Sequence, residues 1–265
     1  MNNDFQRVFV FHGCDRKVGT TMISRCAAKG IAGSNNLRRV LFVCLNGTDD
    51  IHYFTSSASS IEEIKSRVDN NLISGEEIMN YCDRDDNLYI LGGVSGITAH
   101  RDYGVDFSGK LLNEALKVFD IIVADCGNEL DCSLCVGGLT AGACNILVAN
   151  QNETSLLRYE SVKGLYEALN ISFDLCVVNR FLDSDPHDLG FVKARLGESL
   201  FPVFKTVKEE KNYGRIAEMD NRPLSFYKTP GFTGDIKALV RTLTVLTEEV
   251  PLPEYSKKTV KTRRS

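Results

Sequence analysis

The sequence predicts an α/β protein with a doubly wound, mostly parallel sheet that carries helices on both faces. Two observations lead to this fold class. Short apolar, β-branched runs alternate with longer helix-like segments along the 265 residues, which is typical of repeated βαβ units. The runs are apolar at nearly every position, as expected of strands that are buried on both faces of a parallel sheet.

Seven apolar runs are the predicted strands, and the segments around them are the predicted helices. The strands are residues 7–11, 39–45, 87–91, 120–125, 145–149, 173–179 and 201–204. The helices are residues 20–32, 61–70, 75–81, 109–119, 130–141, 153–169, 189–196, 211–220 and 233–247. The serine-rich run 55–60 is predicted to be a loop that ends in a helix N-cap. Ligands of such sheets bind outside the carboxyl ends of the strands, so the residues there are the candidates for function.

Composition limits the class of protein. A hydrophobic content of 43% and a charged content of 25% are ordinary for a soluble globular chain, and a net charge of −4 gives no global reason to bind nucleic acid. The nine scattered cysteines indicate reduced thiols, and the polar N-terminus does not resemble a signal peptide, so we expect a cytoplasmic protein. We expect one domain over residues 1–250 and a basic, disordered tail over residues 251–265. We expect this tail to be solvated, in preference to contacting anionic lipid or DNA.

The first predicted strand leads into a loop that resembles a phosphate-binding P-loop. An apolar run is followed by a polar loop with Gly19, by Thr20 and Thr21, and by a helix. Such loops hold phosphates with consecutive backbone amides and the N-terminus of the helix. The expected phosphate contacts are therefore the backbones of Arg16, Lys17, Val18, Gly19, Thr20 and Thr21. An ordinary strand–helix turn is the alternative interpretation.

Lysine is the residue expected after the last glycine of a P-loop, and this chain has Thr20 there. A charge-assisted bond to the phosphates is thereby lost, although the backbone donors remain. Arg16 or Lys17 is the available replacement cation.

A second motif lies at residues 119–127, where an apolar strand ends in Asp125 and Gly127 follows. The Thr21 hydroxyl and the Asp125 carboxylate are the predicted Mg²⁺ ligands, with the carboxylate acting through water. The alternative for Asp125 is a cap on the next helix.

Taken in order, these segments resemble the MinD/ParA family of P-loop ATPases, the deviant Walker A group of the SIMIBI class. The matching segments are residues 15–22 (phosphate loop), 39–46 (second strand), 87–93 (the family's "NLYILP" strand), 119–127 (Walker B and switch II), 176–180 (base-reading strand) and 208–223 (beside the base). The resemblance implies ATP or ADP with Mg²⁺ as the ligand. It also implies that Asn179 and Arg180 lie at the base, and that the protein is a homodimer with nucleotide at its interface.

The departures from the family pattern fall on its catalytic positions. Asp15 stands for the lysine that reaches across the dimer, Thr20 for the Walker lysine, and Cys44 and Asn46 for the two switch I aspartates. Hydrolysis requires positive charge at the γ-phosphate and an ordered water. We therefore expect at most a slow ATPase, and we expect Asp15 to repel phosphate unless its side chain points away.

The resemblance implies a dimeric positioning or assembly factor of the partition or the pilus and secretion type. The degenerate loop is similar to the CpaE/TadZ-like branch, which organises pilus or secretion machinery. Membrane contact would be at most peripheral, and DNA binding stays open. The alternative is a pseudo-ATPase scaffold that binds no nucleotide and works through protein–protein contacts.

Two further features have ordinary interpretations. Cys132 and Cys135 form a C-x-x-C pair that we expect to be free core thiols. The alternative is that they bind an iron–sulfur cluster that bridges a dimer. His12 at the tip of the first strand either touches phosphate or satisfies a loop carbonyl.

Overall fold

The protein is described from a computed structural model, which defines residues 7–48, 59–96, 98–141, 144–220 and 222–247. Eight strands form one sheet in the order β3-β4-β2-β5-β1-β6-β7-β8. The strands are β1 (Val8–Gly13), β2 (Val40–Cys44), β3 (Asp83–Asp85), β4 (Leu88–Leu91), β5 (Ile121–Asp125), β6 (Cys144–Ala149), β7 (Leu175–Phe181) and β8 (Val203–Lys208). All neighbouring pairs are parallel except β3 with β4. The predicted doubly wound α/β fold is confirmed.

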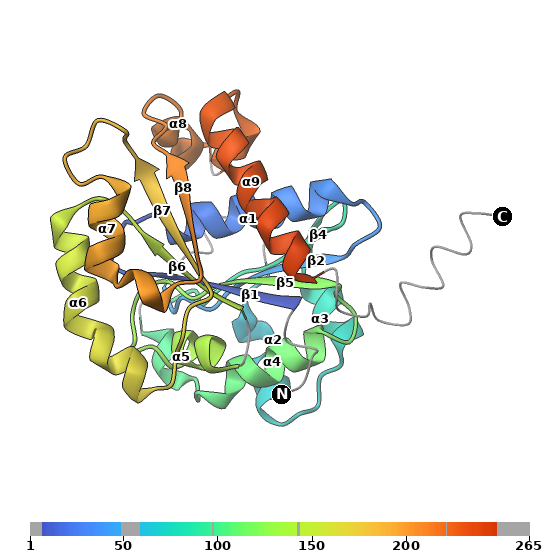
Figure 1. Cartoon of the computed structure of the whole chain (residues 1–265). Helices are drawn as coiled ribbons and strands as arrows, with labels where there is room; N and C mark the ends of the chain where they lie inside the picture. Colours follow the sequence, from blue (N-terminus) through green and yellow to red (C-terminus); the bar gives the residue numbers. More distant parts are fainter. Residues whose placement is uncertain (1–6, 49–58, 97, 142–143, 221, 248–265) are drawn as a thin grey trace.

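Helices cover both faces of the sheet (Figure 1). They are α1 (Thr20–Ser34), α2 (Ile61–Asp69), α3 (Gly75–Tyr81), α4 (Asp106–Ala115), α5 (Ser133–Thr140), α6 (Glu153–Ala168), α7 (Leu189–Leu196), α8 (Gly214–Met219) and α9 (Pro230–Thr247). Helices α1, α8 and α9 lie on one side, and α2 to α5 lie on the other. Helices α6 and α7 pack together beside the β6–β8 half of the sheet.

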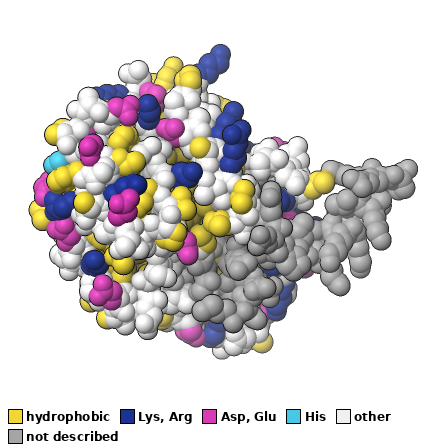
Figure 2. Space-filling view, viewed as in Figure 1, with side chains coloured by type: hydrophobic (Ala, Val, Ile, Leu, Met, Phe, Trp, Pro, Cys, Tyr) yellow, Lys and Arg dark blue, Asp and Glu magenta, His cyan; other side chains and the backbone are white. Residues whose placement is uncertain are grey.

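The core explains why the strand sequences are apolar throughout. Every residue of β1, β2, β4 and β5 is buried, so both faces of these strands are covered. Lys, Arg, Asp and Glu side chains intermingle over the molecular face drawn in Figure 2, as the small net charge suggests.

Strand β3 was not predicted, and its sequence explains the omission. Asp83–Asp85 has no apolar residue and pairs antiparallel with β4 at the edge of the sheet. A left-handed residue, Asp86 with φ 58°, turns the chain between the two strands. Charged residues are typical of edge strands, because they discourage pairing with a further strand. A strand of this composition has no hydrophobic pattern by which the sequence could reveal it.

Other boundaries shift by a few residues. Helix α4 begins and ends earlier than predicted, and α9 begins at Pro230. Strand β8 continues to Lys208, and its second half was not predicted because it contains Lys205, Thr206 and Lys208 and is not an apolar run. The predicted N-cap at the end of the serine-rich run is confirmed at Ser60, which forms a capping box with Glu63. Residues 55–58 of that run and the predicted tail 251–265 lie outside the described residues.

Candidate functional site

The candidate site lies at the carboxyl end of the central strand β1. The chain leaves β1 at Gly13, runs through residues 14–19 and enters α1 at Thr20. In the sheet register, Phe11 of β1 and Cys44 of β2 both pair with Asp125 of β5. The end of β5 is therefore beside the loop that follows β1, as the positions of the two sequence motifs predict.

The backbone of this loop turns twice into the left-handed region. Lys17 has φ 61° and Gly19 has φ 93°. Within the described part of the chain, the amides of Lys17, Val18 and Gly19 donate to no protein group. The amides of Thr20 and Thr21 belong to the first turn of α1, where helix amides have no intrahelical partner. Consecutive free amides in such a turn are suited to an anion.

A hydroxyl and a carboxylate meet beside the loop. Thr21 Oγ1 donates to Asp125 Oδ2 at 2.6 Å, the Gly127 amide donates to Asp125 Oδ1 at 3.1 Å, and Asn46 Nδ2 lies 3.5 Å from Asp125 Oδ2. Asp125 is fully buried, and this burial raises the pKa of its carboxyl, although the three donors act in the opposite direction. Two oxygen ligands of this kind fit Mg²⁺ chemically.

Thr20, which replaces the Walker lysine, packs inward. It is 7% exposed, and its Oγ1 would be only 2.4 Å from a Cβ added at Gly13. The methyl group of Val18 lies on the same glycine, 2.9 Å from such a Cβ. Thr20 and Val18 therefore pack against the backbone of Gly13, and Thr20 supplies no charge to the loop.

The charged residues at the start of the loop have protein partners, and Asp15 Oδ1 accepts from the Arg16 amide at 2.7 Å, so this predicted phosphate donor is already paired. Asp15 Oδ2 accepts from Ser155 Oγ of α6 at 3.1 Å. Arg16 Nε donates to Glu129 Oε1 at 2.8 Å, and Arg158 Nη2 of α6 lies 4.0 Å from the other oxygen of the same carboxylate. Neither Asp15 nor Arg16 fills the loop. Whether the Asp15 carboxylate repels phosphate stays a prediction.

Asn179 lies against the loop instead of standing apart from it. Its Nδ2 donates to the Val18 carbonyl at 2.8 Å and would be 2.4 Å from a Cβ added at Gly19. Arg180 is exposed and left-handed, with φ 54°, where the register of β7 and β8 shifts. The structure thus brings Asn179 to the phosphate loop, and its contact with a base stays a prediction.

The residues at the switch I positions are both buried. Cys44 ends β2 in the core, and Asn46 is 5% exposed with its Oδ1 accepting from the Thr48 amide at 3.1 Å. A Cβ added at Gly127 would lie 2.8 Å from Asn46 Cβ, so the two segments are in close contact. Neither the Asn46 carboxamide nor the Cys44 thiol is a carboxylate that could contact Mg²⁺ or orient an attacking water.

His12 is part of a buried network that the sequence did not predict. Its Nε2 is 2.9 Å from the Tyr166 hydroxyl, and its Nδ1 is 3.4 Å from both the Cys126 carbonyl and Cys135 Sγ. The ring is completely buried and stacks on Phe173. His12 therefore lies beside a loop carbonyl, as one of the two roles considered for it requires. Cys132 and Cys135 are both buried, and all nine cysteines are free thiols in the structure.

Sequence reasoning also missed Ser155 and Glu129 as partners of the loop. Their contacts with Asp15 and Arg16 span 140 and 113 residues of sequence. No local sequence pattern predicts a contact between residues so far apart in the sequence.

Among the residues that the structure describes, no helix combines the length and apolar character needed to cross a membrane. No protein-family model and no curated protein matches the sequence.

Solved structures do match. A ParA family ATPase from Chlorobium tepidum TLS superimposes with a TM-score of 0.77 at 16% identity, covering 89% of this chain and 99% of the other. The septum site-determining protein MinD of Pyrococcus horikoshii OT3, complexed with Mg-ADP, superimposes with a TM-score of 0.71 at 16% identity, and the match covers 92% of this chain and 99% of the other. A chain of the MinC:MinD cell division protein complex of Aquifex aeolicus superimposes with a TM-score of 0.70 at 17% identity, and the match covers 93% of this chain and 98% of the other. The resemblance seen in the sequence is confirmed at the level of architecture: this chain has the P-loop fold of the MinD/ParA ATPases.

Proposed function

We propose that this protein binds ATP or ADP with Mg²⁺ at the loop after β1 and acts as a dimeric positioning or assembly factor. The observation that carries the proposal is the 2.6 Å contact between Thr21 and Asp125 beside a row of free loop amides. A hydroxyl, a carboxylate and an amide nest at the end of a central strand form the donor set that a magnesium-bound phosphate chain requires.

Each residue has a defined part in this proposal. The amides of residues 17–21 bind the phosphate oxygens, and Thr21 and Asp125 hold the metal, Asp125 through water. Bound Mg²⁺ would neutralise the β- and γ-phosphates, a contribution that matters more here because the Walker lysine is absent. Lys17, whose side chain is exposed at the tip of the loop, is the nearest candidate for a replacement cation.

The same site argues for slow hydrolysis or none. Thr20 is packed against Gly13, and neither Cys44 nor Asn46 is a carboxylate. The transition state of phosphoryl transfer is stabilised mainly by preorganised charge, and the described side chains around the loop supply little of it. We propose that nucleotide serves as a switch of conformation or assembly here and is consumed slowly.

The solved structures of the same fold motivate the cellular role. One is a ParA family ATPase, and others are cell division proteins, of which one carries Mg-ADP and one is complexed with MinC. By analogy, we propose a homodimer that serves a larger protein assembly of the partition or the pilus and secretion type, in the cytoplasm. The analogy is one of fold, so the partner has to be identified by experiment.

Calorimetry with Mg²⁺ or with EDTA tests the proposal. Wild-type protein should bind ATP and ADP, and Mg²⁺ should strengthen binding about tenfold or more, equivalent to about 1.4 kcal/mol or more. Thr21→Val keeps the shape of the side chain and should remove the Mg²⁺ increment while leaving the affinity in EDTA unchanged. Thr242→Val is the matched control, because Thr242 lies on α9 with its hydroxyl on the Ala238 carbonyl of its own helix. No heat at high micromolar nucleotide would refute the binding claim.

A scaffold that binds no nucleotide is the second candidate. It is favoured by the same inward packing of Thr20 and by the Asn179 amide, which already has a partner in the Val18 carbonyl. Retention of partner binding by Thr21→Val, together with the absence of any nucleotide heat in the wild type, would establish this candidate over the first.

A further inference from the structure

The carboxylate of Asp15 bridges two parts of the molecule. One oxygen, Oδ1, accepts from the Arg16 amide at 2.7 Å, and the other accepts from Ser155 Oγ at 3.1 Å. Ser155 is 2% exposed and is the third residue of α6. A carboxylate at that position is doubly favoured, because it accepts a charge-assisted hydrogen bond and lies at the positive end of a helix dipole.

Helix α6 begins without a cap of its own. Its N-cap residue, Asn152, makes no side-chain capping bond, and the Asn152 amide donates to Asn150 Oδ1 at 3.0 Å. The Asp15 carboxylate contacts this end of α6 through the Ser155 hydroxyl.

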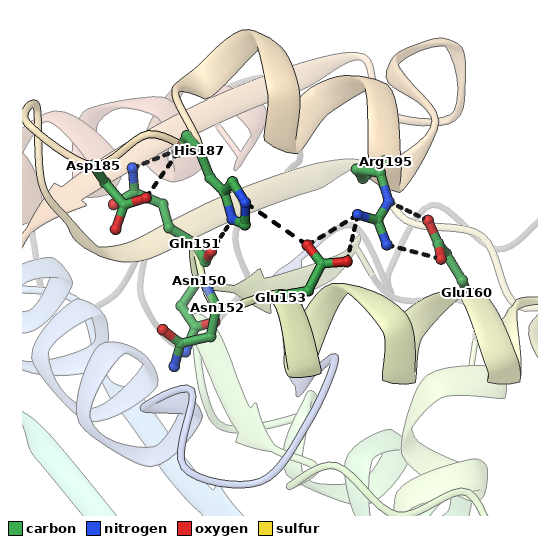
Figure 3. Close-up of polar contacts among 8 residues, drawn as sticks. All are labelled: Asn150, Gln151, Asn152, Glu153, Glu160, Asp185, His187 and Arg195. Atoms are coloured by element: carbon green, nitrogen blue, oxygen red, sulfur yellow. Dashed lines mark hydrogen bonds and ion pairs between the residues drawn. The ribbon is translucent and has the colours of Figure 1, made fainter.

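The start of α6 is itself firmly anchored, as Figure 3 shows. Arg195 of α7 forks between Glu153 and Glu160, with Arg195 Nη1 2.8 Å from Glu153 Oε1 and Nη2 3.0 Å from Glu160 Oε2. Gln151 donates to the His187 carbonyl at 2.7 Å, and His187 Nδ1 is 2.9 Å from the Gln151 carbonyl. Ser155 is thus presented to the loop by an element held in place by its neighbours.

The loop has to sustain an unfavourable turn between two fixed points. Lys17 is left-handed although it is not a glycine, and such a residue persists only where its surroundings determine it. Upstream of Lys17, the Asp15 carboxylate fixes the chain to α6; downstream, the Val18 carbonyl is fixed by Asn179. The turn at Lys17 aligns the free amides of the loop.

We infer that Asp15 is a positioning residue: its contact with Ser155 clamps the phosphate loop to the N-terminus of α6 and keeps the loop amides aligned for phosphate. The inference rests on the proposed function for its ligand, but the state of the loop can be measured with no nucleotide present.

Hydrogen–deuterium exchange and calorimetry on the full chain test this inference. Ser155→Ala leaves the bond between Asp15 Oδ1 and the Arg16 amide in place, so loosening of the clamp alone should speed exchange of the Arg16 amide in this variant. Asp15→Ala and Ser155→Ala should each weaken ADP and ATP binding about tenfold. The double variant should be no worse than the more affected single variant, because both remove one contact. Asp15→Asn, which keeps one acceptor oxygen, should recover part of the affinity.

Matched controls separate the clamp from general destabilisation. Ser161→Ala changes a serine on α6 whose hydroxyl donates to the Arg158 carbonyl, and Asp183→Ala changes an aspartate that is 73% exposed. Both should leave loop exchange and affinity within twofold of the wild type. Unchanged exchange of the Arg16 amide in Ser155→Ala would overturn the clamp. A wild type that binds no nucleotide would refute the proposed function, while loop exchange would still decide whether the clamp exists.

Discussion

At the scale of single residues, burial of Asp125 destabilises the ionised form of its carboxyl. Its carboxylate is fully buried, and burial raises its pKa above the value of an unfolded chain. The native state therefore holds this proton more tightly than the unfolded state does. Ionised Asp125 lowers the free energy of unfolding progressively as pH rises from about 3.8 through the raised pKa.

Asp125→Asn should accordingly raise the melting temperature at pH 7 while abolishing the Mg²⁺ increment in nucleotide affinity. The stability gain should shrink as pH falls towards 4, because the wild-type carboxyl is then protonated as well. Each kcal/mol gained corresponds to about 2–4 °C for a domain of this size. Thermal unfolding between pH 4 and pH 8 measures this difference, with the exposed Asp183→Asn as the control. Parallel pH profiles for Asp125→Asn and the wild type would contradict the argument.

The proximity of Thr21 and Asp125 could be predicted from sequence, because one follows and the other ends an apolar strand, and the ends of parallel strands share one edge of the sheet. Ser155 and Glu129 could not be predicted. They contact Asp15 and Arg16 only because α6 and the segment after β5 fold back onto the loop.

At the scale of elements, a glycine just before α1 and a glycine within it have opposite requirements. Gly19 precedes the helix with φ 93°, and a Cβ there would lie 2.4 Å from Asn179 Nδ2. Gly33 lies within the helix, and nothing is within 4 Å of an added Cβ. Gly19→Ala should lower the free energy of unfolding by about 1–3 kcal/mol, because the left-handed turn and the Asn179 contact are both disturbed. Gly33→Ala should raise it by about 0.5–1 kcal/mol through helix propensity.

Urea denaturation of the two variants measures both changes. Equal effects of the two substitutions would mean that the turn before α1 is not held as described. The elements themselves were largely predictable because long apolar or periodic segments dominate this chain. Strand β3 was not predictable, since its three charged residues become a strand only through pairing with β4.

At the scale of the whole molecule, spacing along the chain predicts a parallel sheet but not which strands are neighbours. The central strand β1 lies between β5 and β6, which come more than a hundred residues later. Only the pairing of buried faces across the complete fold determines that order. The same burial determines how the cysteines behave.

Seven of the nine cysteines are buried, and Cys82 and Cys144 are partly exposed. Burial raises the pKa of both Cys82 and Cys144 to about 12, so few of even these thiols are ionised at pH 8. A thiol reagent should therefore modify the native protein slowly, with Cys82 and Cys144 first, and should titrate nine thiols after denaturation without reductant. Mass spectrometry of the partially labelled protein identifies the first sites. Fewer than nine thiols in the denatured protein would reveal a disulfide or a bound metal, and fast labelling of Cys126 or Cys135 would show that the network around His12 opens to solvent.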